Sequence, residues 1–283
     1  MSIDRPAAAP TGVQPELQQV GLNHPKVRQL RSVERNSAPN PHRLFVAEGL
    51  WAAKLLLRHQ VHIDTFFWCP DAVLSTEAPK LAVELARRAE RAYQIGPKVS
   101  EKLSERDRPD GLLLMARLPQ WRPEDLVLGP DALVAVADGM NIPGNLGTLI
   151  RTIDACGADA LVLTNRRTRL THPMVFRASQ GMLLTVPIID FDDDRDAVAW
   201  LKAEEFDVFL AGTEDAVGYR AVPYEGRRTA VVVGSERKGL SPTWESGSFR
   251  HIAIPMLGVA DSLNVSIAAS VLLYEARARK AGW

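Results

Sequence analysis

Short apolar runs alternate with longer amphipathic stretches through the second half of the chain. The runs have the length and branched composition of buried strands, and the stretches between them have helical periodicity. This order predicts a mostly parallel α/β sheet with helices on both faces, because parallel strands need long crossover connections. The predicted strands are 132–137, 160–163, 184–189, 208–211, 230–233 and 252–254.

The first half of the chain predicts a smaller α/β module. Apolar runs at 44–46 and 65–68 indicate strands on either side of a helix at 50–57, and a further helix is expected at 81–92. Residues 1–15 are rich in Ala and Pro, which predicts a disordered tail, and Pro and Gly punctuate the chain from 118 to 130. The predicted organisation is a tail at 1–15, a domain at 16–118, a linker at 119–131 and a domain at 132–283.

The stretch 252–270 is expected to organise the second domain. Pro255 cannot donate to a sheet ladder, so the strand should end there and release a loop. Asp261 and Ser262 are N-cap candidates for an apolar helix at 265–274, which we expect to be buried except at its end. Asn264 at the mouth of this helix needs hydrogen-bond partners. It is either part of an extended cap or a site residue.

Charge and cysteine usage narrow the class of protein. The net charge is zero, with 34 basic and 34 acidic residues, but a cut after Arg117 gives 17 basic against 13 acidic (+4) and then 17 against 21 (−4). This asymmetry is weakly typical of a substrate-capturing module joined to a catalytic one. Cys69 and Cys156 lack disulfide or zinc spacing, and there is no signal-peptide core or long apolar run. We therefore expect a soluble, cytoplasmic protein that neither contacts a membrane nor binds a metal.

A basic cluster precedes the first predicted strand. Five cations lie between residues 26 and 43, where Glu34 is the one acid. Their spacing from Arg28 to Arg35 places several on one helical face, which suits contact with phosphates; the alternative is an ordinary solvated helix face. The cluster comprises Lys26, Arg28, Arg31, Arg35 and Arg43.

A glycine-containing segment follows the first strand of the second domain. Gly144 and Gly147 would permit close approach of backbone or ligand, although their spacing fits neither the dinucleotide fingerprint nor the phosphate loop. Asn145 and Arg151 lie six residues apart, close to two turns, so both are expected to face one cleft. Arg151 suits a phosphate or a carboxylate, and an ion pair with Asp154 is the alternative.

Glu236 occupies a comparable place after a later strand. The buried run 231–233 leads into a glycine-flanked acidic loop at the carboxyl edge of the sheet, where open α/β sheets bind ligands. Taken together with the segments described above, three motifs occur in order along the chain: N-x-x-G-N-x-G-x-x-x-R, V-V-G-S-E-x-x-G-L-S and I-P-M-x-G-x-x-x-S-L-N-V-S-x-A.

These three motifs resemble those of the SpoU/TrmH family of RNA ribose 2′-O-methyltransferases, within the SPOUT superfamily. The resemblance implies a deep trefoil knot at the C-terminus, S-adenosylmethionine as the methyl donor without a metal, and a homodimer in which two subunits complete each site. The region at 43–49 also resembles the ribosomal-protein-like, RNA substrate-binding N-terminal domain that is common in the family.

The resemblance assigns roles by position. It implies catalytic roles for Asn145, Arg151, Glu236, Ser262 and Asn264. It implies S-adenosylmethionine binding by Ala211, Gly212, Thr213, Gly234, Ile254, Met256 and Leu263. Independently of the resemblance, apolar Ile254, Met256 and Leu263 suit the walls of an adenine site.

The choice of RNA is less specific, because ribosomal and transfer RNA enzymes of the family share all three motifs. A separate N-terminal domain favours 23S ribosomal RNA, and transfer RNA is the alternative. The overall arrangement also resembles family members that confer resistance to ribosome-targeting antibiotics, which makes such a role an expectation for this chain. A nucleotide-dependent dehydrogenase is disfavoured because the glycine-rich first turn is missing. A non-catalytic RNA-binding protein is the alternative of another class.

Overall fold

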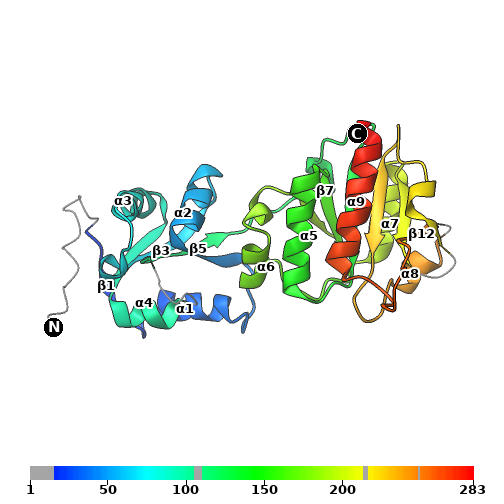
Figure 1. The fold of residues 1–283 in the computed structure, drawn as a ribbon. Coiled ribbons are helices and arrows are strands. Elements are labelled where there is room, and N and C mark those ends of the chain that lie inside the picture. Colours follow the sequence, from blue (N-terminus) through cyan, green and yellow to red (C-terminus); the bar gives the residue numbers. More distant parts are fainter. Residues whose placement is uncertain (1–15, 105–109, 213–215, 248) are drawn as a thin grey trace, which may run out of the picture. The chain divides into compact units, whose positions relative to one another are not determined.

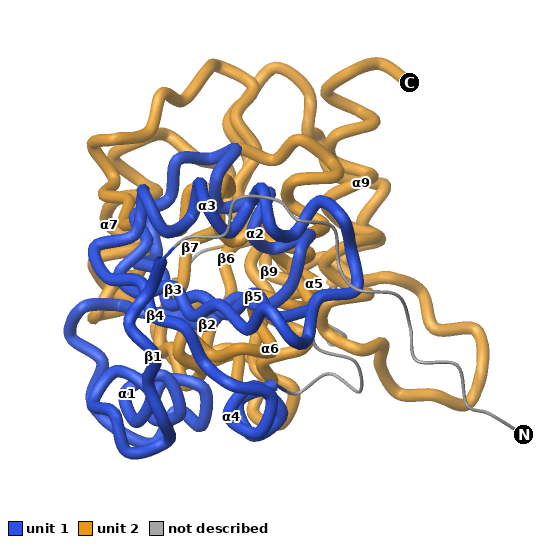
Figure 2. Tube along the Cα trace, turned by 90° about the vertical axis from the view of Figure 1, so that its left-hand side faces the viewer, with its two compact units in different colours: residues 1–119 blue, residues 120–283 orange. Residues whose placement is uncertain are grey.

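The chain consists of two compact units, 1–119 and 120–283 (Figure 2). The computed structural model describes residues 16–104, 110–212, 216–247 and 249–283. The predicted tail at 1–15 lies outside the described residues. Residues 120–131 of the expected linker belong to the second unit, where Leu126 and Leu128 pack against the core.

The first unit is a five-stranded sheet in the order β1-β4-β3-β5-β2, with helices on both faces. Helices α1 and α4 cover one face, and α2 and α3 cover the other (Figure 1). The strands are β1 (Gln19–Val20), β2 (Leu44–Glu48), β3 (Ile63–Trp68), β4 (Arg91–Ile95) and β5 (Leu112–Arg117), and the helices are α1 (Pro25–Glu34), α2 (Gly49–Arg58), α3 (Ala78–Arg88) and α4 (Pro97–Leu103).

The predicted helix at 81–92 is wrong at its C-terminal end. Helix α3 ends at Arg88, and the chain returns as β4, which pairs in parallel with β3. The backbone N–H of Glu90 already donates to Ile63 O at 3.0 Å, so sheet pairing overrides the helix propensity of the alanines and arginines there. Strands β1, β4 and β5 were not predicted, whereas β2, β3 and α2 lie where the apolar pattern predicts them.

The second unit is a seven-stranded sheet in the order β10-β12-β9-β11-β6-β7-β8, and all its described strand pairs are parallel. This confirms the predicted α/β class. The strands are β6 (Leu133–Asp138), β7 (Ala160–Thr164), β8 (Ile188–Asp190), β9 (Asp207–Ala211), β10 (Val217–Gly218), β11 (Thr229–Val233) and β12 (Arg250–Ala253). The helices are α5 (Pro143–Cys156), α6 (Pro173–Ala178), α7 (Asp194–Ala203), α8 (Pro242–Glu245) and α9 (Val265–Ala281).

The side chains of each strand point alternately to the two faces of this sheet, so the core of the unit has two layers. Val134, Val136, Val162 and Val232 pack with Trp244 and residues of α7 on one face. Helices α5 and α9 run side by side on the other face (Figure 1). Because both faces are covered, the central strands read as continuous apolar runs, which is why the sequence located most of them.

Two local predictions for this unit are wrong. The strand expected at 184–189 is confined to Ile188–Asp190, because residues 182–184 form a 3-10 turn and Pro187 lacks an N–H. Helix α9 is not buried all round, since Ile267 and Tyr274 are 49% and 41% exposed. The short strand β10 was not expected. The trefoil knot implied by the resemblance stays a prediction.

No helix in the described part of the chain combines the length and the apolar character needed to cross a membrane.

Gly147 sets the distance between α5 and α6. A Cβ at this position would lie 2.6 Å from Ala178 Cβ and 2.8 Å from the carbonyl oxygen of Val175. Both are well inside ordinary van der Waals contact, so the two helices can approach this closely only because the side chain is missing. Gly144 in the same helix has no atom within 4 Å of its built Cβ.

Gly147→Ala should therefore lower the free energy of unfolding of the second unit by about 1–3 kcal/mol, the usual cost of overpacking. Gly144→Ala is the matched control, and it should leave stability within about 1 kcal/mol of the wild type or raise it. Denaturant titrations followed by circular dichroism measure both. Equal losses for the two variants would contradict the role given to the α5–α6 contact.

Candidate active site

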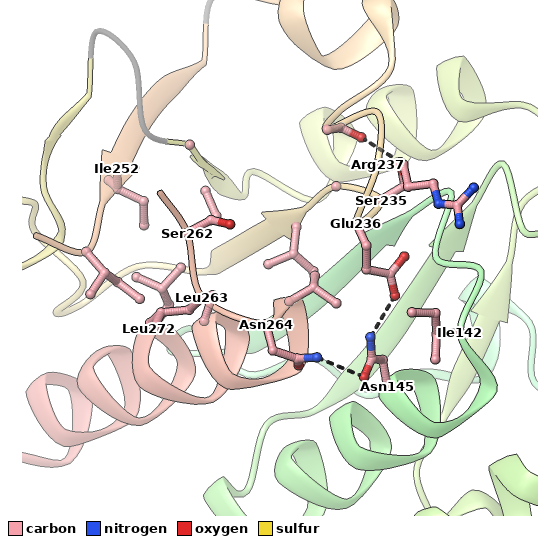
Figure 3. A pocket seen from close by; sticks show the side chains of 18 of the residues that line it. Ile142, Asn145, Ser235, Glu236, Arg237, Ile252, Ser262, Leu263, Asn264 and Leu272 are labelled. Atoms are coloured by element: carbon pink, nitrogen blue, oxygen red, sulfur yellow. Dashed lines mark hydrogen bonds between the residues drawn. The ribbon is translucent and has the colours of Figure 1, made fainter. Parts of the chain in front are cut away.

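A pocket of about 540 Å³ lies at the carboxyl edge of the second unit's sheet (Figure 3). Residues from all three sequence motifs line it, together with the end of β9. The predicted residues among them are Asn145, Ala211, Gly212, Gly234, Glu236, Ile254, Met256, Ser262, Leu263 and Asn264. Sequence reasoning missed Ile142, Val233, Ser235, Arg237, Gly239, Ile252, Val265, Ala268 and Leu272.

One side of the pocket is apolar. Ile252 comes from β12, Ile254 and Met256 from the loop that follows it, and Leu272 from α9. Leu272 lies two turns into the helix, away from any motif residue, so only the fold could identify it. Within the described residues no group of three or more His, Cys, Asp or Glu side chains is placed to hold a metal ion.

The polar side of the pocket is a chain of three side chains. Asn145 Nδ2 donates to Glu236 Oε1 at 2.8 Å, and Asn264 Nδ2 donates to Asn145 Oδ1 at 3.1 Å (Figure 3). The other carboxylate oxygen of Glu236, Oε2, is buried and has no hydrogen-bond partner among the described residues. A buried carboxylate oxygen without a donor is costly, so this atom marks the place where a ligand donor would bind.

A tight loop carries Glu236. Backbone hydrogen bonds join Ser235 and Gly239 in both directions, at 2.9 and 3.0 Å. A Cβ on Gly234 would lie 2.5 Å from the carbonyl oxygen of Gly239 and 2.6 Å from the nitrogen of Leu240, so the loop can close only with glycine at position 234. The closed loop holds Glu236 at its tip.

Asn264 is both a helix cap and a site residue. Its Oδ1 accepts hydrogen bonds from the backbone N–H and the hydroxyl of Ser266, at 3.0 and 2.6 Å, while its Nδ2 reaches Asn145. Asn264 therefore caps α9 and also lines the pocket. Asp261 and Ser262 are not the cap, because α9 begins at Val265. Ser262 lines the pocket instead.

Arg151 does not line the pocket formed by its own chain. It is exposed on α5, and no ion pair joins it to Asp154 or to another acid in the described part of the chain. Six residues along an α-helix turn a side chain by roughly 240° from its starting direction. The expectation that Arg151 and Asn145 face one cleft is therefore wrong within a single chain.

The basic cluster of the first unit is only partly free. Lys26 Nζ pairs with Asp64 Oδ1 at 2.7 Å, with side chains only 15% and 12% exposed. Burial alone would raise the pKa of Asp64, but hydrogen bonds from Lys26 and Thr65 hold it below its usual value. Arg43 donates to the carbonyl oxygen of Pro119. The remaining members, Arg28, Arg31 and Arg35, follow one face of α1 and its C-cap, and Arg28 and Arg35 are exposed. The predicted ligand residue Thr213 lies outside the described residues.

Comparisons with known families match both units. The family model described as "SpoU rRNA Methylase family" matches residues 132–274, and the one described as "MRM3-like substrate binding domain" matches residues 24–114. A protein from Staphylococcus epidermidis, assigned to the TrmH family of tRNA/rRNA methyltransferases, is 38% identical over 144 residues, which are 50% of this chain and 57% of that protein. The chain thus spans little more than half the length of this curated relative.

Two solved structures are similar over almost the whole chain. An rRNA methyltransferase from Sinorhizobium meliloti with bound AdoMet is 26% identical, with a TM-score of 0.82 over 92% of this chain and 97% of that one. A crystal structure described as an RNA 2′-O ribose methyltransferase is 29% identical, with a TM-score of 0.75 over 93% and 99% of the two chains.

The two functions of Asn264 can be separated by substitution. Asn264→Ala removes the cap and should lower the free energy of unfolding by about 0.5–2 kcal/mol. Asn264→Asp keeps an acceptor for Ser266 and should restore most of that stability, since carboxylates also cap helices well. It cannot donate to Asn145. Thermal and denaturant unfolding of the three proteins tests this, and an aspartate variant as unstable as the alanine variant would contradict the capping role.

Proposed function

The chain belongs to the SpoU rRNA methylase family, and on that premise we propose that it transfers a methyl group from S-adenosylmethionine to a ribose 2′-hydroxyl of RNA. The observation that supports this most is the pocket, in which an apolar wall faces the chain of Glu236, Asn145 and Asn264. The names of the similar structures, one with bound AdoMet and one described as a 2′-O ribose enzyme, point the same way.

The residues of the pocket fit the methyl donor. A volume of about 540 Å³ is in the range of small-molecule sites. Ile254, Met256 and Leu263 offer apolar contacts for adenine. When bound, S-adenosylmethionine would supply a methyl group activated by its sulfonium.

In the proposed reaction the ribose oxygen forms a bond to the methyl carbon as the carbon–sulfur bond breaks, and the hydroxyl proton must leave. We assign Glu236 Oε2 to accept the hydrogen bond of this hydroxyl and then its proton, because it is the carboxylate oxygen of the pocket that has no partner among the described residues. Asn145 fixes the other oxygen, and Asn264 fixes Asn145. A guanidinium stays protonated, so Arg151 is assigned to the neighbouring phosphate and the developing alkoxide.

The position of Arg151 supports a homodimer in which one subunit supplies the arginine to its partner. The side chain is exposed and outside its own pocket. Apolar side chains are also exposed on the loop after β12 and on α9, where a second copy could cover them: Leu257 is 97%, Val259 100%, Ile267 49% and Tyr274 41% exposed.

Arg151→Ala should lower methyl transfer by about two or more orders of magnitude, the range typical of losing a positioned electrostatic group. The dissociation constant of S-adenosylmethionine should barely change, because Arg151 does not line the pocket. Arg151→Lys should recover only part of the rate, since lysine keeps the charge without the planar fork. Near-normal turnover by the alanine variant would remove Arg151 from the mechanism.

A heterodimer shows which subunit the arginine serves. One subunit carries Arg151→Ala and the other Glu236→Gln, and the mixed dimer is purified through two different tags after co-expression. If Arg151 acts in the partner's pocket, one of the two sites is intact and activity should be about half that of the wild-type dimer. If it acts in its own subunit, both sites are defective, and an inactive heterodimer would contradict the proposal.

We further propose that the first unit captures the RNA through Arg28, Arg31 and Arg35. These cations follow one face of α1, and the matching family model is a substrate-binding domain. A ribosomal substrate, 23S RNA, remains our choice because of this separate unit, with transfer RNA as the alternative. A role in antibiotic resistance stays a prediction.

Reversing the charge of Arg28 and Arg35 to glutamate should weaken RNA binding at least about tenfold and lower the slope of log Kd against log salt by about two. The matched control reverses Arg58 and Arg87, which are exposed on α2 and α3 over the opposite face of the same sheet (Figure 1). Filter binding at several salt concentrations compares the pairs. Equal weakening would show a bulk-charge effect and count against the α1 surface.

Two experiments test the proposed function. Calorimetry measures the binding of S-adenosylmethionine to the protein. Primer extension at limiting deoxynucleotides then maps methylation on 23S, 16S and transfer RNA that have been incubated with the protein and S-adenosylmethionine. We expect binding, and a stop at one position of 23S RNA. A stop on transfer RNA alone would favour the alternative substrate. If the protein binds RNA but has no affinity for S-adenosylmethionine, the proposed methyltransferase activity is wrong, and a non-catalytic RNA-binding function is favoured.

A further inference from the structure

Asp138 is a buried carboxylate that the proposed chemistry does not use. It is the last residue of β6, is only 2% exposed, and no ion pair joins it to a cation within the described residues. A buried carboxylate without a counter-ion costs free energy unless several donors compensate it. The contacts of Asp138 therefore indicate what it does.

Its two oxygens connect two different loops. Oδ1 accepts hydrogen bonds from Thr164 Oγ1 at 2.9 Å and Asn165 Nδ2 at 2.7 Å, both at the end of β7. Oδ2 accepts from the backbone N–H of Ser241 at 2.6 Å. Ser241 ends the loop that follows β11, 103 residues further along the chain.

That loop is the one that holds Glu236. Its first part is closed by the hydrogen bonds between Ser235 and Gly239, so an anchor at Ser241, which follows Gly239 closely in the chain, supports the same closed loop. A second carboxylate supports the same end, because Ser241 Oγ donates to Asp194 Oδ2 at 2.7 Å. The hydrogen bond to Asp138 differs because it fixes the backbone of Ser241, and its acceptor belongs to the last residue of strand β6.

We propose that Asp138 is a positioning residue that holds Glu236 in register with Asn145 by anchoring the backbone of Ser241. It does not line the pocket. This inference rests on the proposed function of Glu236, and it adds a residue that acts on the reaction only through that side chain.

Asp138→Asn distinguishes the contacts of the two carboxylate oxygens. The carboxamide oxygen can still accept from Thr164 and Asn165, but its NH₂ group then faces the N–H of Ser241, donor against donor. Thr164→Val is the matched control, because it removes a hydrogen bond to the same carboxylate and leaves Ser241 attached. Both variants should unfold at a lower temperature than the wild type.

At saturating S-adenosylmethionine and RNA, Asp138→Asn should lower kcat by about ten- to a hundredfold, the effect of a misplacement of about 1 Å. Thr164→Val should stay within about threefold of the wild type. In a Glu236→Gln background, Asp138→Asn should add less than about a twofold loss, because its effect passes through Glu236. If Asp138→Asn does not fold, Ser241→Pro replaces it: Ser241 has φ −75°, which suits proline, and proline lacks the donor.

The outcomes are distinct. An unchanged kcat in Asp138→Asn, an equal kcat loss in Thr164→Val, or the full loss persisting in the Glu236→Gln background would each overturn the positioning role. In these cases the wild type is still active, so the proposed function stands. A wild type that transfers no methyl group would instead overturn the proposed function, and the role of Asp138 with it.

Discussion

Parallel pairing in the second unit brings distant loops to one edge of the sheet. Every described strand pair of this sheet is parallel, so the loops that follow β6, β9, β11 and β12 leave it in the same direction. Asn145, Glu236 and Asn264 each follow a different strand and still meet within hydrogen-bond distance. The pocket depends on this constraint, because no two of these residues are neighbours in the sequence.

Local devices then fix each loop at that edge. The missing side chain of Gly234 lets the loop of Glu236 close on itself, and that of Gly147 lets α6 pack against the helix of Asn145. Asn264 caps α9 through its amide oxygen and reaches Asn145 through its amide nitrogen. Stability and site geometry therefore rest on the same few atoms. One oxygen of Glu236 is left over, and the proposed chemistry starts there.

Much of the second unit could be predicted from its sequence, because strands buried on both faces are continuous apolar runs and the motifs follow them directly. Short or half-exposed strands such as Arg91–Ile95 could not, since pairing with β3 and not composition makes them strands. The ion pair of Lys26 with Asp64 could not be predicted either, because the two residues lie 38 positions apart in the chain. Helical geometry alone could have predicted that Arg151 points away from Asn145, because six residues are not a whole number of turns. Leu272 carried no local signal.

The proposed acceptor of the methyl group is a ribose oxygen of RNA. The direct measurement uses S-adenosylmethionine with a deuterated methyl group, digestion of the treated RNA to nucleosides, and fragmentation of the labelled nucleoside by mass spectrometry. If the ribose is the acceptor, the label stays with the ribose fragment and the base fragment is unlabelled. A label on the base fragment, or no labelled nucleoside from any of the three RNA classes, would contradict it.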